Sequence, residues 1–468
     1  MMTCFSTRTA AGSAVRSARG AVKAALAAGA TVSVTAGTFA AVAAVVAVVT
    51  LSTPDAAHAQ VQRIPSPAAA PQAIARPVYS DAAALGKLLF YDPSLSASGR
   101  MSCASCHSPA HAYGPPNGLA AQLGGADLRS QGTRAVPTLR YVLDRTPIWT
   151  HVQAASLGER FEDDDAPAGG FGWDGRFNRL RDQATFPLFN PGEMANRDAA
   201  AVVAKLARAP YAARFKQVFG ETVFDSPQAA LSEAMTAIER YELEEPDFHP
   251  YTSKFDDYLD GKAQLTASEL RGKKLFDDPN GGNCASCHID QPGANGAHPL
   301  FTDFQFEALG VPRNPELRVN RDPAYYDEGL CGPLRHDLVA DPTMCGLFKT
   351  PTLRNVATRA VFFHNGRFHT LRDALRFYVE RDTNPEKWYP RDRQGQVVKF
   401  DDLPPALRRN VDVTDAPLTS KRGGKPVWNA RDIDDVIAFL KTLDDGYRPA
   451  AQPARAPMPQ AGRAAGGA

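Results

Sequence analysis

The pentapeptide Cys-Ala-Ser-Cys-His occurs twice in this chain, at residues 103–107 and again at residues 284–288. In the Cys-x-x-Cys-His pattern of c-type haem attachment, the two thiols bind the porphyrin vinyl groups and the adjacent imidazole binds the iron. A zinc site would need further Cys or His pairs at suitable spacing, and a redox Cys-x-x-Cys does not require the histidine. The sequence therefore predicts two covalently bound haem c groups. Their attachment residues would be Cys103, Cys106 and His107 for haem 1, and Cys284, Cys287 and His288 for haem 2.

The first 59 residues are typical of a signal peptide. Four positive charges precede an uncharged run at residues 24–54, and Ala-His-Ala at residues 57–59 offers a small-residue cleavage site. A cleaved signal predicts a periplasmic protein, and an uncleaved membrane anchor is the alternative, since a run counted from Thr31 could just span a bilayer. The net charge of +1 gives no indication of nucleic-acid binding. In an oxidising compartment, the two cysteines outside the signal and the haem motifs, Cys331 and Cys345, would form a disulfide rather than stay free.

The rest of the chain predicts a mainly α fold with two cytochrome c-like haem domains and long loops. Apolar residues recur at helical spacing from Asp81, near 199–207, at 227–243, from Thr266 and at 429–443, and no alternating strand pattern persists. Gly-Lys-x-Leu-Phe precedes both haem motifs, which indicates a repeat of a whole domain start. We expect a Pro/Ala-rich linker at residues 60–78, an N-terminal haem domain at 79–247, a C-terminal haem domain at 248–447 and a disordered tail at 448–468.

The sixth iron ligand decides what each haem can do. Outside the signal, the tail and the residue before haem motif 1, the methionines are Met194, Met235 and Met344. His111 lies four residues from His107, so it cannot reach the opposite face of the same haem. Haem 1 is therefore expected to have an open or water-occupied distal site, where ferric iron could bind and activate peroxide.

Several further motifs resemble the bacterial dihaem cytochrome c peroxidase/MauG superfamily over nearly all of residues 79–447. They are "GKLLFYDPSLS" before haem motif 1, "GWDGR" at 172–176, "QATFPLFNPGEM" at 183–194, "FHPYTSKFDDYL" at 248–259 and the long segment 348–375 after haem motif 2. The resemblance implies that Trp173 lies between the haems and transfers electrons, and that Glu193 lies on the distal side of haem 1 as an acid–base group. It also implies that His364 is a neighbour of haem 2 rather than a ligand.

Tyr378 stands where the reductive peroxidases of this superfamily place the haem 2 methionine, and the MauG branch also has a tyrosine there. A phenolate is hard and anionic and stabilises iron(III) and iron(IV), whereas a thioether stabilises iron(II). With Tyr378 as ligand, haem 2 would store one oxidising equivalent while haem 1 holds the other, which is a bis-Fe(IV) state. Met344 is the rival ligand.

The superfamily commonly binds calcium between its domains through an Asn side chain and two carbonyl groups. Here Ala135 stands at the Asn position, with the carbonyl positions at Arg359 and Val361, which weakens the expectation of a calcium ion.

The resemblance implies an exported peroxidase acting on hydrogen peroxide as a monomer or homodimer. Its electrons would come from a small periplasmic donor protein, a cytochrome c or a cupredoxin, or from a protein substrate that becomes oxidised. The alternative function is a non-enzymatic dihaem electron-transfer cytochrome.

Overall fold

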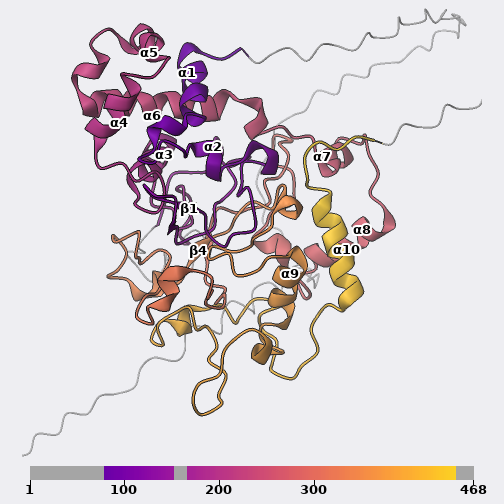
Figure 1. Ribbon diagram of the computed structural model, residues 1–468. Coiled ribbons are helices and arrows are strands. Elements are labelled where there is room, and N and C mark those ends of the chain that lie inside the picture. Colours follow the sequence, from indigo (N-terminus) through magenta and orange to yellow (C-terminus); the bar gives the residue numbers. More distant parts are fainter. Residues whose placement is uncertain (1–77, 152–165, 450–468) are drawn as a thin grey trace, which may run out of the picture. The chain divides into compact units, whose positions relative to one another are not determined.

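The computed structural model describes residues 78–151 and 166–449, which form part of one compact unit beginning at Ile74. The signal peptide, nearly all of the linker and nearly all of the tail lie outside the described residues. The described part is mainly helical, as the sequence predicts (Figure 1). Its α-helices are α1 (Asp81–Phe90), α2 (Cys103–Cys106), α3 (Leu180–Phe189), α4 (Ala199–Leu206), α5 (Ala212–Phe219), α6 (Pro227–Glu244), α7 (Lys254–Leu259), α8 (Ala267–Asp277), α9 (Leu371–Glu380) and α10 (Ala430–Lys441).

Strands are confined to two short antiparallel pairs in this part of the chain. β1 (Leu123–Gly124) pairs with β2 (Ser130–Gln131), and β3 (Phe306–Glu307) pairs with β4 (Phe348–Lys349). No helix in residues 78–151 or 166–449 is both long enough and apolar enough to cross a bilayer.

Two helix pairs repeat the same packing. α1 packs against α6, and α8 packs against α10. Each pair crosses at a glycine: a Cβ atom at Gly86 would lie 1.8 Å from the Ala237 carbonyl oxygen, and one at Gly272 would lie 1.9 Å from the Asp435 carbonyl oxygen. Only glycine allows backbones to approach so closely. These glycines belong to the two Gly-Lys-x-Leu-Phe motifs, so the repeated motif marks a repeated helix crossing.

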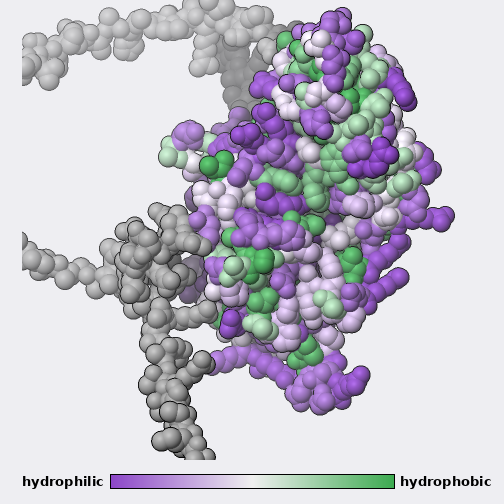
Figure 2. Space-filling view, turned by 90° about the vertical axis from the view of Figure 1, so that its left-hand side faces the viewer, coloured by the Kyte–Doolittle hydropathy of each residue, from purple (hydrophilic) through white to green (hydrophobic). Residues whose placement is uncertain are grey.

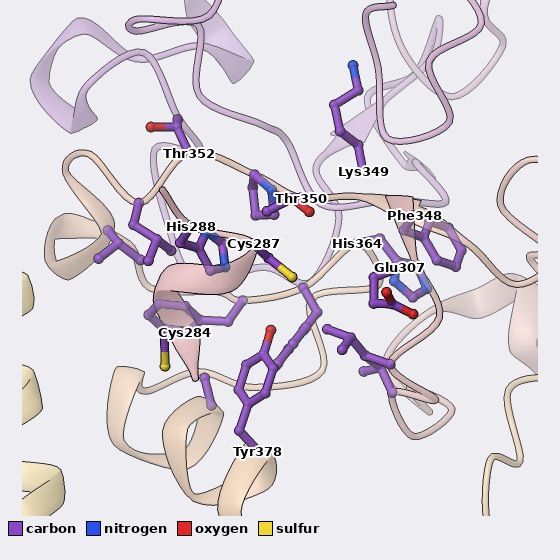
Figure 3. A pocket seen from close by; sticks show the side chains of 18 of the residues that line it. Cys284, Cys287, His288, Glu307, Phe348, Lys349, Thr350, Thr352, His364 and Tyr378 are labelled. Carbon is purple, nitrogen blue, oxygen red and sulfur yellow. The ribbon is translucent and has the colours of Figure 1, made fainter. Parts of the chain in front are cut away.

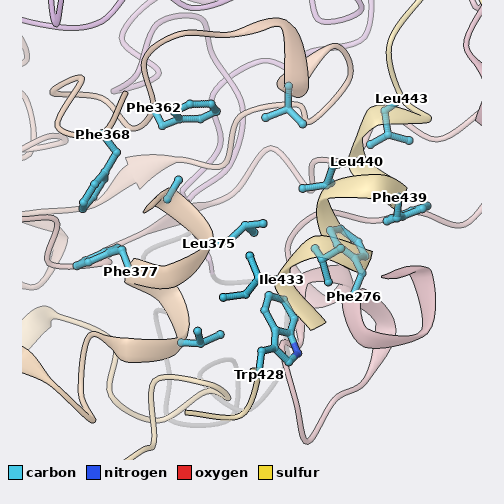
Figure 4. Close-up of a cluster of buried hydrophobic side chains, with 14 of the residues drawn as sticks. Phe276, Phe362, Phe368, Leu375, Phe377, Trp428, Ile433, Phe439, Leu440 and Leu443 are labelled. Carbon is cyan, nitrogen blue, oxygen red and sulfur yellow. The ribbon is translucent and has the colours of Figure 1, made fainter. Parts of the chain in front are cut away.

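Each helix pair belongs to its own apolar core. The core around α1, α3, α4, α5 and α6 takes its residues from the chain before position 240. The core around α7, α8, α9 and α10 takes its residues from the chain after position 254, and Figure 4 shows α10 side chains such as Ile433 and Phe439 packed beside Phe276 of α8. We refer to residues 79–247 as the N-terminal half and to 248–447 as the C-terminal half; these boundaries stay a prediction. On the face shown in Figure 2, apolar residues are scattered in small groups among polar ones.

Helices α3 and α9 were not expected from the sequence, although they also repeat each other. Each has ten residues and begins with Leu-Arg-Asp. Before each helix the chain makes a tight loop, closed by a bridge between Phe171 and Phe177 in one half and between Phe362 and Phe368 in the other. The motif "WDGRF" lies in the first loop and "HNGRF" in the second. Every element from loop to helix end therefore has a counterpart 191 positions later, as 362 − 171 shows.

Buried ion pairs join the two halves. Arg134 forms an ion pair with Asp174 in its own half and another with Asp327 in the C-terminal half, both at 2.7 Å. All three side chains are less than a tenth exposed. Breaking such a pair would leave a buried charge uncompensated, so the network holds the two halves in one arrangement. Within the C-terminal half, Cys331 and Cys345 form the predicted disulfide.

Candidate functional site

The first Cys-x-x-Cys-His motif forms one turn of helix and ends at its histidine. Cys103 and Cys106 are the first and last residues of α2, and His107 is its C-cap. The His107 Nδ1 lies 3.0 Å from the Tyr113 carbonyl oxygen, and the ring also interacts with the Pro137 carbonyl. Burial lowers the pKa of His107 to about 4, so the imidazole is neutral. A neutral imidazole oriented through Nδ1 has the protonation state in which Nε2 can bind a metal.

The second motif repeats this geometry. The His288 Nδ1 lies 2.9 Å from the Phe301 carbonyl oxygen, and the ring interacts with the Pro351 carbonyl. Pro137 and Pro351 each begin a Pro-Thr-Leu-Arg segment. Burial lowers the pKa of His288 to about 4 as well. Both histidines are therefore neutral and are held through Nδ1 by a main-chain carbonyl, as a haem ligand would be.

A cavity of about 300 Å³ lies between the two halves. Cys284, Cys287, His288 and Tyr378 line it from the C-terminal half, and Trp173 and Gln183 line it from the N-terminal half. In Figure 3 the Tyr378 hydroxyl points into the cavity, toward the segment that carries Cys287 and His288. The lining is mostly apolar and has thiols, an imidazole and a phenol at its wall, so it fits a haem.

His364 supports this fit from the cavity wall. Its ring stacks on Phe348 with centroids 3.5 Å apart, and its buried Nε2 has no hydrogen-bond partner among the described residues. A buried polar atom without a partner is costly, and a haem propionate would supply one. The position agrees with the expected role of His364 as a neighbour of haem 2, which stays a prediction.

The residue at the position of the candidate sixth ligand differs between the halves. Tyr378 is the eighth residue of α9, and the eighth residue of α3 is Pro187. A proline side chain has no atom that binds iron. Burial raises the pKa of the Tyr378 phenol above its usual value, so the phenol would ionise only when a metal ion replaces its proton.

The methionines do not compete for this position. Met194 and Met235 are buried in the apolar core of the N-terminal half, and Met344 is absent from the lining of the cavity. The rival ligand for haem 2 thus lies outside the cavity that Tyr378 faces.

Glu193 lies in the turn after α3, close to haem motif 1. Its Oε1 accepts a hydrogen bond from Asn190 at 2.7 Å. Burial, and then the charge of Glu193, raise the pKa of Cys106 to about 12, so the charge of Glu193 acts on a thiol of haem motif 1. Burial raises the pKa of Glu193 itself to about 7, although Asn190 and Arg176 act to lower it. A carboxyl group with a pKa near 7 suits general acid–base catalysis at neutral pH.

Trp173 lies at the junction of the two halves. Its Nε1 donates a hydrogen bond to the Ala135 carbonyl at 2.8 Å, and its own carbonyl accepts one from the Lys349 amide at 2.9 Å. Its ring meets the His364 ring edge to face, with centroids 6.5 Å apart. Because Trp173 and His364 are counterparts in the repeated loops, the two loops touch through equivalent residues.

Comparison with known proteins agrees with this geometry. A family model described as "Di-haem cytochrome c peroxidase" matches residues 80–264. Methylamine utilization protein MauG of Paracoccus denitrificans is 35% identical over 409 residues, which cover 83% of this chain and 95% of that protein. The chain belongs to the dihaem cytochrome c peroxidase/MauG family.

Other members of the dihaem peroxidase/MauG family are also similar. Cytochrome c551 peroxidase of Nitrosomonas europaea is 31% identical, over 69% of this chain and 80% of that one. The crystal structure of the dihaem peroxidase BthA from Burkholderia thailandensis superposes with a TM-score of 0.70 at 39% identity, covering 80% of this chain and 88% of that one. The protein is thus a dihaem oxidoreductase of the peroxidase type, with two haem groups and peroxide as substrate.

The structure adds residues to the site that sequence reasoning missed. Gln183 lines the cavity from α3. Arg176 packs against the rings of Phe177 and Phe186, with its guanidinium 4.6 and 4.4 Å from their centroids, and its charge acts on Glu193. The repeat between "WDGRFNRLRD" and "HNGRFHTLRD" pairs Arg176 with Arg367 and, continued through the two helices that follow, pairs Pro187 with Tyr378, so it is the sequence signal for these positions.

The residues at the family's calcium position do not fit a calcium ion. Ala135 has no side-chain oxygen, and the Val361 carbonyl already accepts a hydrogen bond from Arg359 Nε at 3.3 Å. A carbonyl oxygen facing a guanidinium is not free to bind a second cation. No step of the reaction is therefore assigned to calcium.

Proposed function

We propose that this protein is an exported peroxidase in which haem 1 reacts with hydrogen peroxide and haem 2 stores one of the two oxidising equivalents. The observation that carries this proposal is the difference at the eighth residue of two equivalent helices, Pro187 in α3 and Tyr378 in α9. One haem would lack a protein ligand on its distal side, and the other would have an anionic oxygen ligand.

The four thiols would hold both haems covalently, and His107 and His288 would be the proximal ligands. When bound, the haem irons supply the cleavage of the peroxide O–O bond and accept the oxidising equivalents. Tyr378 would keep haem 2 in the ferric form at rest, because a phenolate stabilises the higher charge on iron.

Glu193 would move the proton of the peroxide. Its carboxylate would take the proton from the inner oxygen and return it to the outer oxygen, so that the outer oxygen leaves as water. Asn190 holds Oε1 and thereby orients the carboxylate.

Trp173 would provide the electron path between the haems. It contacts residues of both halves, and its fixed indole N–H keeps the ring in one orientation. The electrons that restore the resting enzyme would come from a small periplasmic donor protein or from a protein substrate that is oxidised in the process. The Cys331–Cys345 disulfide supports an oxidising compartment such as the periplasm.

Electron paramagnetic resonance of the ferric protein tests the ligand assignment. We expect one high-spin haem with an open or water-occupied site and one low-spin haem whose signal changes in Tyr378→Phe. Peroxide addition then separates an enzyme from an electron carrier. An enzyme would show rapid and reversible spectral changes, whereas slow bleaching alone would support the electron-transfer cytochrome.

A further inference from the structure

Three consecutive carbonyl groups, those of Ala135, Val136 and Pro137, contact three separate parts of the site. The Ala135 carbonyl accepts the hydrogen bond from Trp173 Nε1, and the Pro137 carbonyl interacts with the His107 ring. The middle carbonyl, Val136, accepts a hydrogen bond from Arg359 Nη2 at 2.9 Å. This short segment therefore positions both the haem 1 ligand and the tryptophan between the haems, and Arg359 holds its centre.

Arg359 reaches this segment from the C-terminal half. It follows a short 3-10 turn at Val356–Thr358, and its side chain lines the cavity. Nε donates to the Val361 carbonyl while Nη2 donates to Val136, so one planar group joins two segments 225 positions apart (361 − 136). The Ala135 amide adds a second link, because it donates to the His364 carbonyl at 2.7 Å.

The guanidinium has carbonyl partners instead of a carboxylate partner. In residues 78–151 and 166–449, no carboxylate forms an ion pair with Arg359. Burial lowers its pKa to about 10, so it is still a cation at neutral pH. A buried cation satisfied by main-chain carbonyl oxygens is the arrangement that a bound calcium ion also makes.

We propose that the Arg359 guanidinium is a built-in replacement for the calcium ion of this family, and that this protein holds the segment 135–137 in place without metal. Arg359 is a positioning residue: it acts on His107 and Trp173 through the main chain that contacts them. Ala135 completes the replacement, because it lacks the side-chain oxygen that a metal would need. The proposal does not depend on which haem reacts with peroxide.

The metal content of the wild-type holoprotein is the first test. After dialysis against EGTA, we expect substoichiometric calcium by elemental analysis, and no change in the melting temperature, the haem spectra or the peroxide reaction when calcium is added back. One calcium ion per chain, removed by EGTA with a fall in melting temperature, would overturn the proposal.

A double variant is the second test. Ala135→Asn with Arg359→Thr restores a side-chain oxygen and removes the internal cation. We expect this variant to bind one calcium ion per chain, with a melting temperature that rises with calcium concentration because calcium binds the folded state. The single variant Ala135→Asn is the matched control and should not respond to calcium, since the guanidinium is still present.

Arg359→Lys and Arg359→Gln separate the charge from the shape of the side chain. We expect Arg359→Gln to alter the haem 1 electron paramagnetic resonance signal and its potential, and Arg359→Lys to restore them in part, which a purely space-filling role would not produce. Haem content is measured in parallel. If Arg359→Gln loses haem while the double variant ignores calcium, the guanidinium binds a haem propionate and the proposal is wrong.

Discussion

The two halves of this protein share one plan and differ at the residues that meet the haem. Both have a glycine-crossed helix pair, a Cys-x-x-Cys-His turn and a histidine held through Nδ1 by a main-chain carbonyl. They differ at the eighth residue of α3 and α9, which is Pro187 in one half and Tyr378 in the other. The comparison shows that a repeated scaffold carries different side chains at equivalent positions of its two halves, here a proline in one and a tyrosine in the other.

The loops before these helices differ in a related way. Trp173 and His364 are counterparts, yet the Trp173 indole donates its N–H to the Ala135 carbonyl, whereas the His364 ring stacks on Phe348 and has a buried nitrogen without a hydrogen-bond partner among the described residues. The asymmetry of the site is therefore concentrated in the loop and the helix that follow each other in both halves.

The largest expected effect comes from making the halves alike. In Pro187→Tyr we expect a six-coordinate low-spin haem 1 and loss of the peroxide reaction to the background rate, because the phenol would occupy the distal position. Electron paramagnetic resonance and stopped-flow absorbance measure both. A variant that keeps an open haem and its peroxide rate would show that α3 and α9 do not face their haems equivalently.

Replacing the acid–base group should have the next largest effect. We expect Glu193→Gln to slow the reaction with peroxide by about 100-fold or more, because the amide cannot transfer the proton between the two oxygens. Exposed Glu221→Gln is the matched control and should react at the wild-type rate. An unchanged rate in Glu193→Gln removes this residue from the mechanism.

Exchanging the proposed haem 2 ligand should shift its potential. We expect Tyr378→Met to raise the haem 2 potential by about 100 mV or more, because a thioether favours iron(II). The two-electron-oxidised state should no longer form. Spectroelectrochemical titration measures the shift, and normal formation of that state in the variant would mean that Tyr378 is not the stabilising ligand.

The pH dependence that Glu193 gives to the peroxide rate should be a smaller effect. Proton acceptance needs the Glu193 carboxylate, whose pKa burial raises to about 7, with Asn190, Arg176 and the Cys103 and Cys106 sulfurs around it. The peroxide rate should therefore rise about tenfold between about pH 6 and pH 8. The rise should be absent in Glu193→Gln, and a rate that falls over this range would contradict the assignment.

The smallest effect is a difference between two matched variants. Gly86→Ala and Gly272→Ala should each destabilise the protein by about 1–3 kcal/mol or more, since the new methyl group meets backbone of the partner helix. The two should differ by less than about 1 kcal/mol. Thermal unfolding of the holoproteins measures the loss of stability in each variant. A clear difference between the two losses would show that the two helix crossings contribute unequally to stability.

Much of the site could be predicted from local sequence. The two haem motifs, the helices α1, α4, α6, α8 and α10 and the Cys331–Cys345 disulfide were all predicted, and the structure contains the helices and the disulfide. Periodic apolar residues and capping residues such as Ser226 and Asn429 act over a few positions, so they can be recognised without the fold.

Helices α3 and α9 were not predicted from the sequence. α3 carries a proline in its interior, so it lacks the pattern of a free-standing helix. α9 has an N-cap at Thr370 and buried apolar residues at helical spacing, so its pattern could have been recognised in the sequence. Tertiary packing against the rest of each half stabilises them, and packing overrides local propensity.

The sequence alone identified the two haem motifs and most of the longer helices, because thiols, imidazoles and helix-forming patterns act through near neighbours along the chain. Only the tertiary structure decided which side chains lie opposite the histidine of each haem motif. It also decided that Arg359 joins Val136 to Val361. These contacts connect residues far apart in the chain, and no short-range pattern specifies them; they follow from how the two halves pack against each other.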